Sequence, residues 1–377
     1  MTGLTDLVAD GDVIVCCGTG GVGKTTTAAV LALAAARRGR NAVVVTIDPA
    51  KRLADTLGIA DIGNTAHEIP RARWGDGATD AGHLAALMLD TRATFDGLIG
   101  RYARDDEQAD RILTNGFYRN IASALSGTQE YMAMVKLYEL HEEGGYDLIV
   151  VDTPPTRHAL DFLDAPQRLT RLLDNRIFRF LMMPTRTYVR VASRAVQRFL
   201  RTVGKVIGAD VLDDIVAFFR AFEGMEPGFR ARAARVDELL LASSTAFVLI
   251  TSARRDAVDE AEFFAHRLRE ADLGVAALVV NRVHPDFDEH RPADVLRGEA
   301  RAVRLLGGEA AERLAARYEN LADHVALADE ERRRLADVGA RIGAATVVYV
   351  PSLAHDVVDF EALKTVAHLL VEDGATR

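Results

Sequence analysis

A glycine-rich stretch near the N-terminus has the residue types and the spacing of a phosphate-binding loop. Residues 18–25 read GTGGVGKT and match the pattern G-x-x-x-x-G-K-[ST], between an apolar run and a helical pattern. Glycines let successive backbone N–H groups face an anion, and the following helix adds the positive end of its dipole. Lys24 would reach the β- and γ-phosphates, and Thr25 would place its hydroxyl on Mg²⁺. The predicted nucleotide site comprises Gly18, Thr19, Gly20, Gly21, Val22, Gly23, Lys24, Thr25 and Thr26.

Two aspartates at the ends of apolar runs are candidates for the other polar groups of such a site. Asp152 ends DLIVVD at the Walker B position, where a carboxylate holds Mg²⁺ through water. Asp48 ends AVVVTID. Each could instead be a helix cap or a turn residue that follows a strand. Thr25 and Asp152 are therefore the predicted metal-binding residues.

Seven short runs rich in β-branched residues must position these groups. They are typical of parallel strands buried on both faces, and helical patterns separate them; they span 12–17, 42–47, 84–89, 147–152, 246–251, 275–280 and 346–350. We therefore predict an α/β fold, a doubly wound and mostly parallel sheet of the P-loop NTPase type. Two long helix-rich interruptions, at about 154–245 and 283–345, are interpreted as helical insertions on one domain that spans 1–377.

Three stretches of the chain together resemble the deviant Walker A ATPases of the ArsA type: GTGGVGKTT, TIDPAKRLAD and VVDTPPTRHALDFLDAP. This family includes the arsenite-efflux ATPases and the ATPases that target tail-anchored membrane proteins, and actinobacterial members look nearest. The resemblance runs from the first strand to VVYVPSL, with the motifs in the family's order. It implies a dimeric ATPase that uses ATP/ADP and Mg²⁺.

The resemblance also implies roles for individual residues. Asp48 would orient or activate the attacking water, and Asp152 with the TPPT that follows it would sense the γ-phosphate. Asn281 in VVNRVHP would read the adenine edge, and Pro351 in VPSL would pack against the base. Asn281 and Pro351 could instead be ordinary turn residues at strand ends.

Thr19 and Arg157 depart from the family's wording. Thr19 stands where the family has a lysine that reaches into the partner's site in a face-to-face dimer, and Arg157 replaces a glycine of the second switch. A homodimer would thus lack the trans cation at both sites. Three outcomes follow: a heterodimer with a lysine-bearing sister subunit, replacement of the lysine by another residue such as Arg157, or a regulatory subunit that binds nucleotide and hydrolyses little.

Charge and cysteine content bound the remaining function classes. The net charge of −9 argues against nucleic-acid binding, although residues 168–205 hold ten basic residues and one acid. The adjacent Cys16 and Cys17 can form neither a CxxC zinc pair nor a disulfide framework within one chain, so no structural zinc is expected. As(III) binding by this pair is disfavoured because neighbours on a strand point to opposite faces; an anion- or arsenite-efflux subunit stays an alternative.

The absence of a signal peptide or apolar span predicts a cytoplasmic location, with peripheral membrane association left open.

The first insertion raises the possibility of a client. Arg186, Arg190, Arg194 and Arg198 form one stripe at helical spacing, and the segment from Val211 to Met225 is broadly apolar. In the targeting ATPases the equivalent insertion builds a groove for a client helix, so a membrane-protein client or an anionic membrane surface would fit. The alternative is that these helices pack on one another while the arginines are solvated.

Overall fold

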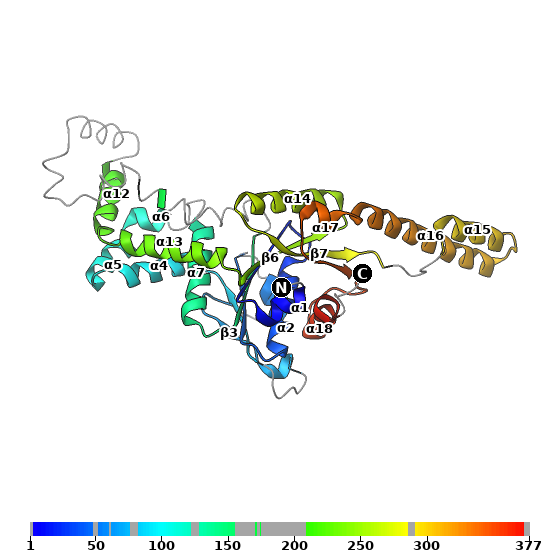
Figure 1. Ribbon diagram of the computed structural model, residues 1–377, viewed down its shortest axis with the longest axis horizontal. Helices are drawn as coiled ribbons and strands as arrows, with labels where there is room; N and C mark the ends of the chain where they lie inside the picture. The colour runs from blue at the N-terminus through cyan, green and yellow to red at the C-terminus, as the bar shows by residue number, and fades with distance from the viewer. Residues whose placement is uncertain are drawn as a thin grey trace.

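The computed structural model describes residues 3–47, 52–59, 62–75, 82–121, 128–154, 170–171, 174, 209–285 and 291–372. Its centre is one eight-stranded sheet (Figure 1). The strands are β1 (Val13–Gly18), β2 (Ala42–Thr46), β3 (His67–Glu68), β4 (Leu84–Met88), β5 (Leu148–Asp152), β6 (Thr245–Ser252), β7 (Val275–Val283) and β8 (Val347–Pro351). All seven strands expected from the sequence are present, which confirms the α/β fold class.

The strand order is β3-β4-β2-β5-β1-β6-β7-β8, so β1 lies between β5 and β6 in the middle of the sheet. Every neighbouring pair is parallel except β3 with β4, which is antiparallel. The sequence did not predict β3, because two exposed polar residues at a sheet edge carry no hydrophobic pattern. Parallel pairing brings the carboxyl ends of β1, β2, β5, β6 and β7 to one edge, where the polar motifs follow them.

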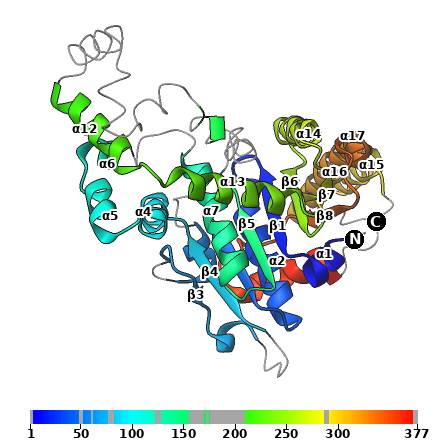
Figure 2. The same cartoon turned by 60° about the vertical axis from the view of Figure 1, so that its left-hand side comes forward.

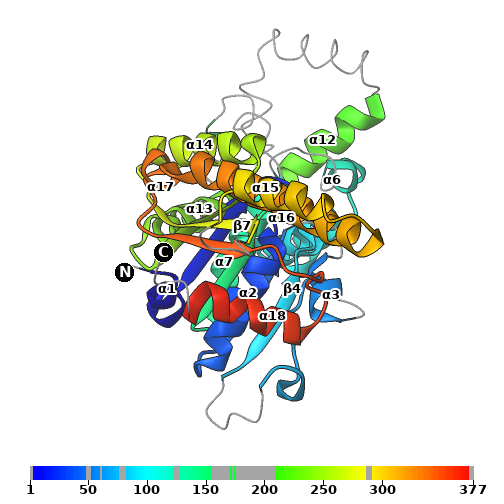
Figure 3. The same cartoon turned by 90° about the vertical axis from the view of Figure 1, so that its right-hand side faces the viewer.

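Helices cover both faces of the sheet. One face packs against α1 (Leu4–Asp10), α2 (Lys24–Arg37), α3 (Arg52–Leu57) and α18 (Phe360–Ala367). The other packs against α7 (Thr128–Glu143), α13 (Glu226–Leu241), α14 (Arg255–Glu270) and α17 (Val338–Ile342). Figure 3 shows α14 and α17 on one side of the sheet and α18 on the other. A single-turn helix at Arg71–Arg73 and a C-terminal turn at His368–Glu372 complete the elements described around the sheet.

A lobe of helices stands to one side of the sheet (Figures 1 and 2). It contains α4 (Thr91–Tyr102), α5 (Asp106–Leu113), α6 (Gly116–Ile121) and α12 (Ala209–Ala221), with α7 and α13 joining it to the sheet. Its aromatic core includes Tyr118, Phe218, Phe222 and Phe229. Phe218, Phe222 and Met225 of the apolar segment 211–225 are thus buried against the lobe's own residues, as expected if these helices pack on one another.

Two helices of the second interruption form a projecting arm. α15 (Ala293–Arg304) and α16 (Glu309–Leu335) pack side by side and extend away from the sheet (Figure 1). A small core of Leu296, Ala322 and Val325 holds them together, while Leu305 and Leu306 at the turn between them are exposed. In the part of the chain that the structure describes, no helix has the length and apolarity needed to cross a membrane.

Candidate nucleotide site

The glycine-rich loop lies at the carboxyl end of β1 and leads directly into α2. Gly23 has a left-handed backbone with φ of 96°, and a Cβ at this position would overlap the side-chain amide nitrogen of Asn281. Gly18, at φ of 153°, would place a Cβ against the carbonyl oxygen of Ile250 on β6. Both positions therefore require glycine, and this close approach fixes the loop between β1 and the neighbouring strands.

Lys24, the first residue of α2, folds back over its own loop. Its side chain is almost fully buried, and its ammonium donates a hydrogen bond to the carbonyl oxygen of Thr19 at 2.7 Å. Thr19 is half-buried on the opposite limb of the loop. The ammonium thus lies inside the loop, at the position from which it can turn toward bound phosphates.

Thr25 and Asp152 are in direct contact, as a shared metal site requires. The Thr25 hydroxyl donates to Asp152 Oδ2 at 2.7 Å, and the Thr46 hydroxyl from the end of β2 donates to the same oxygen at 3.0 Å. Asp152 is buried at the end of β5. Hydroxyl and carboxylate oxygens are hard donors of the kind Mg²⁺ prefers, so the residues present fit this ion.

The other predicted catalytic aspartate lies outside the described residues. Asp48 follows β2 by two positions, and the description of this segment stops at Ile47, whose N–H donates to the carbonyl oxygen of Asp152. Of the second-switch motif TPPT the structure describes Thr153, whose hydroxyl donates to the Cys16 carbonyl at 2.8 Å, and Pro154. Arg157 and the arginine stripe from Arg186 to Arg198 also lie outside the described residues.

Asn281 and Arg282, at the end of β7, hold the phosphate loop by its carbonyl oxygens. The Asn281 amide nitrogen donates to the Val22 carbonyl at 2.8 Å, and Arg282 Nη1 donates to the Gly21 carbonyl at 3.1 Å. Arg282 adopts a left-handed backbone with φ of 59°, which is uncommon for a residue with a long side chain. Pro351 ends the neighbouring strand β8 and is in register with Val283. The base-binding roles expected for Asn281 and Pro351 stay predictions.

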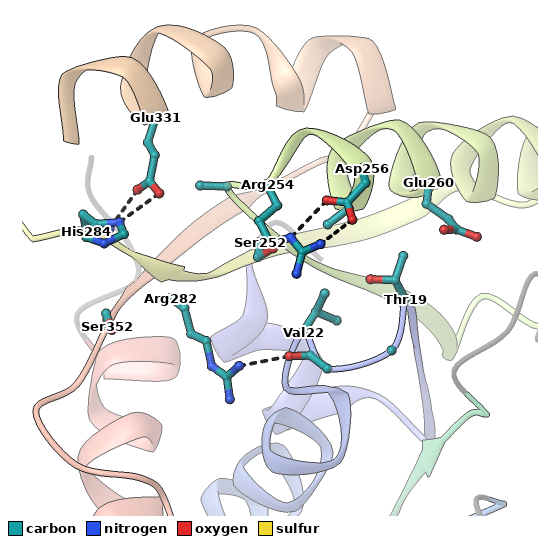
Figure 4. A pocket seen from close by; sticks show the side chains of 14 residues that line it. Thr19, Val22, Ser252, Arg254, Asp256, Glu260, Arg282, His284, Glu331 and Ser352 are labelled. Atoms are coloured by element: carbon teal, nitrogen blue, oxygen red, sulfur yellow. Dashed lines mark hydrogen bonds and ion pairs between the residues drawn. The ribbon is translucent and has the colours of Figure 1, made fainter. Parts of the chain in front are cut away.

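Two hollows flank the loop. One, of about 280 Å³, is bordered by Lys24, Thr25, Thr26 and Thr153 on the phosphate side. The other, of about 350 Å³, lies on the β6 and β7 side and is bordered by Thr19, Val22, Arg254 and Ser352 among others (Figure 4). Arg282 borders both hollows and lies between the expected places of phosphate and base.

His284 and Glu331 connect this site to the arm. Glu331 of α16 accepts hydrogen bonds from the backbone N–H of His284 and from its ring Nδ1, each at 2.9 Å (Figure 4). The sequence did not reveal this pair or the loop contact of Arg282. His284 and Arg282 lie in the motif VVNRVHP, which could have identified them as site residues. Glu331 lies 47 residues after His284 and is in no motif that would identify it.

Cys16 and Cys17 lie on opposite faces of β1, in the two separate cores of the sheet. Burial raises the pKa of the Cys16 thiol well above its usual range and that of Cys17 to about 12. Both side chains are therefore neutral thiols near neutral pH, whereas a soft metalloid binds thiolate. The expectation that this pair is poorly suited to As(III) agrees with both findings.

The sequence is similar to one known family and to curated proteins. The profile of a family described as anion-transporting ATPase, ArsA_ATPase, matches residues 12–302. ATPase GET3 of Chaetomium globosum is 31% identical over 156 residues, which are 41% of this chain and 43% of that protein. ATPase get3 of Aspergillus terreus is 32% identical over 158 residues, with the same coverage of both chains.

Those matched segments span less than half the length of the curated relatives, whereas the family profile covers most of this chain. The profile begins just before β1 and includes all three stretches on which the resemblance is based, as well as Asn281. The chain belongs to the ArsA-type family of anion-transporting ATPases.

Proposed function

We propose that this chain binds ATP with Mg²⁺ and hydrolyses it, as a dimeric switch of the ArsA type. The observation that carries the proposal is the 2.7 Å contact between the Thr25 hydroxyl and the Asp152 carboxylate. Thr25 directly follows the loop lysine, Lys24. Membership of the ATPase family supports the reaction, and the glycine loop at the start of α2 supports the anionic ligand.

Each residue of the site has a distinct task in this proposal. Backbone N–H groups from Gly20 to Gly23 bind phosphate oxygens, and Lys24 leaves the Thr19 carbonyl to donate to the β- and γ-phosphates. Thr25 and Asp152 hold Mg²⁺, which when bound neutralises charge on the phosphates. Asp48 orients the attacking water.

Asn281 and Arg282 would keep the loop in its binding shape. Their side chains donate to the Val22 and Gly21 carbonyls, which turns these oxygens away from the anion and leaves the loop's N–H groups to face it. Asn281 and Pro351 are proposed to contact the adenine, together with the larger hollow, which is bordered by their chain neighbours Arg282 and Ser352. Arg282 adds a positive charge in cis at the edge of the phosphate hollow.

The missing loop lysine favours a sister subunit. Thr19 carries no charge and lies at the rim of the hollow on the β6 side of the loop, so we propose that a related, lysine-bearing ATPase subunit supplies the trans cation in a heterodimer. The alternatives are a homodimer in which Arg282 or Arg157 substitutes, and a regulatory subunit that binds nucleotide with little hydrolysis.

A membrane-protein client is proposed on the family resemblance and on the helical lobe that joins the sheet through α7 and α13. Because Phe218, Phe222 and Met225 already form the core of this lobe, a client would have to use other surfaces of it. The family's description as anion-transporting ATPases supports the second candidate, a subunit that powers efflux of an anion.

Calorimetry with Mg·ATP and Mg·ADP tests the nucleotide site. The wild-type chain should bind one nucleotide, and Lys24→Met should weaken binding by about 10- to 100-fold because it removes a charged hydrogen-bond donor to the phosphates. Lys364→Met, on α18 and not on the border of either hollow beside the loop, is the matched control and should bind like wild type. Absence of nucleotide binding by the folded wild-type chain would refute the proposal.

A further inference from the structure

A second positively charged hollow lies in the helical lobe, away from the phosphate loop. It has a volume of about 290 Å³ and lies between α4, α7 and α13, which stand side by side in Figure 2. Three arginines border it, one from α4 and two from α13: Arg101, Arg232 and Arg235. Glu142 is the acidic residue on its border, and Tyr102 and Tyr138 supply aromatic rings with hydroxyl groups.

Arg232 is the residue that makes this hollow unusual. Its side chain is only 3% exposed, and its Nε and Nη2 have no hydrogen-bond partner within the described part of the chain. Removing a guanidinium from water without hydrogen bonds is energetically costly, so such groups are normally paired. The buried hydroxyl of Tyr131 nearby also lacks a hydrogen-bond partner within the same part.

The neighbours of Arg232 compensate its charge only in part. Glu139 Oε1 lies 3.8 Å from Arg232 Nη2, too far for a hydrogen bond, and the other oxygen of Glu139 accepts from Lys136 at 3.2 Å. The ring of Tyr138 lies 4.9 Å from the guanidinium carbon and gives a cation–π contact. One carboxylate is thus shared between two cations, while Arg235 at the rim is 3.6 Å from the exposed Glu238.

We propose that this hollow binds a small oxyanion, with Arg232 as its central cation and Arg101 and Arg235 at its rim. Guanidinium groups bind tetrahedral and carboxylate oxyanions through paired N–H donors, and an anion here would offset the buried charge that Glu139 leaves uncompensated. The volume is close to that of the hollow on the phosphate side of the loop, and it is large enough for a small anion. This site is separate from the nucleotide site and does not depend on it.

The experiment uses the full chain saturated with Mg·ADP, so that the phosphate loop is occupied. Inorganic phosphate and sulfate are titrated at constant ionic strength, with chloride as the reference salt, while Tm and binding heat are followed. We expect a saturable rise in Tm and one binding event in wild type. Acetate in a parallel titration shows whether carboxylates share the site with tetrahedral anions.

Three variants decide the result. Arg232→Met should lose the anion-dependent rise in Tm, whereas Arg230→Met, on the same helix but not on the border of the hollow, should keep it. Arg101→Met with Arg235→Met, which changes exposed rim residues only, should weaken anion binding at least tenfold and guards against misfolding of the Arg232 variant. A response of Arg232→Met and of the rim variant equal to wild type, or no saturable response in wild type, overturns the proposal.

One more experiment distinguishes failure of this proposal from failure of the function proposed for the phosphate loop. Lys24→Met in the absence of nucleotide should still bind sulfate in the lobe hollow, because no residue of the loop borders it. Absence of nucleotide binding by the wild-type chain, together with retained sulfate binding in wild type and in Lys24→Met, would refute only the function proposed for the loop. Nucleotide binding by the wild-type chain without saturable sulfate binding would refute only the anion site.

Discussion

At the scale of single residues, the loop and β7 constrain each other through Gly23 and Asn281. Gly23 leaves room for the Asn281 amide, which in turn donates to the Val22 carbonyl. A substitution of either residue alone should lower stability. A Cβ at position 23 would overlap the Asn281 amide, and truncation of Asn281 would leave the Val22 carbonyl without this donor. This reciprocity makes the pair testable by a double-mutant cycle.

Gly23→Ala is expected to lower Tm and to abolish nucleotide binding, because alanine would have to adopt the left-handed backbone of Gly23 and its Cβ would overlap Asn281. Adding Asn281→Ala removes the overlap but leaves the backbone cost of about 1–2 kcal/mol. The double variant should therefore be less destabilised than the sum of the two single variants, measured by urea unfolding. Strict additivity would show that the two side chains do not meet.

The two buried thiols predict a loss of stability at alkaline pH. The pKa of each is raised by burial, so each thiol deprotonates more easily in the unfolded chain than in the folded one. Their contribution is fully present below the unfolded pKa of about 9 and is lost as pH rises toward the folded pKa.

Between pH 9 and pH 10 the free energy of unfolding should fall by about 1 kcal/mol per thiol. Urea unfolding at the two pH values measures this change. The double variant Cys16→Ala, Cys17→Ala, although less stable at the outset, should show a smaller fall over the same interval. An equal fall in both proteins would assign the pH dependence to other groups.

At the scale of elements, local patterns predicted most of the residues that lie together at the candidate nucleotide site. The sequence predicts the loop glycines, Lys24, Thr25 and Asp152 because they directly follow or end buried strands. Parallel pairing of those strands then brings the residues together. The contacts of Asn281 and Arg282 with the loop were not readable, because they join residues about 260 positions apart. The antiparallel β3 was not predicted either, because its two exposed polar residues carry no hydrophobic pattern and it forms only by pairing with β4.

The contact between β7 and the arm predicts a link between α16 and the nucleotide site. Glu331→Ala leaves the backbone N–H and the ring of His284 without their acceptor in a nearly buried place, so stability should fall by about 1–3 kcal/mol. Because His284 follows the strand end that holds the loop, Mg·ADP affinity should fall as well.

Glu330→Ala is the matched control for this helix. Glu330 is exposed and pairs with Arg334 one turn away, a contact worth only a few tenths of a kcal/mol. Urea unfolding and calorimetry on both variants would check the link. Unchanged ADP affinity in a destabilised Glu331→Ala variant would show that α16 supports the fold but not the site.

At the scale of the whole molecule, the proposed hydrolysis needs a positive charge that stabilises the transition state. Thr19 borders the hollow on the β6 side of the loop, and its carbonyl rather than its side chain engages Lys24. Arg282 is the described cation that borders both hollows, but it belongs to the same chain as the loop. In the function proposed above, the trans cation would come from a partner subunit.

Restoring the lysine in this chain tests that requirement. Thr19→Lys should raise the ATPase rate of the isolated chain at least about tenfold, approaching the factor of about 10³ that a finger residue supplies, because a homodimer would then place one ammonium at each site. Thr19→Met has similar length without charge and should leave the rate low. Arg282→Gln should abolish whatever turnover remains if the cis arginine acts as the substitute. Brisk turnover by the unmodified chain that Thr19→Lys does not increase would remove the reason for a lysine-bearing partner.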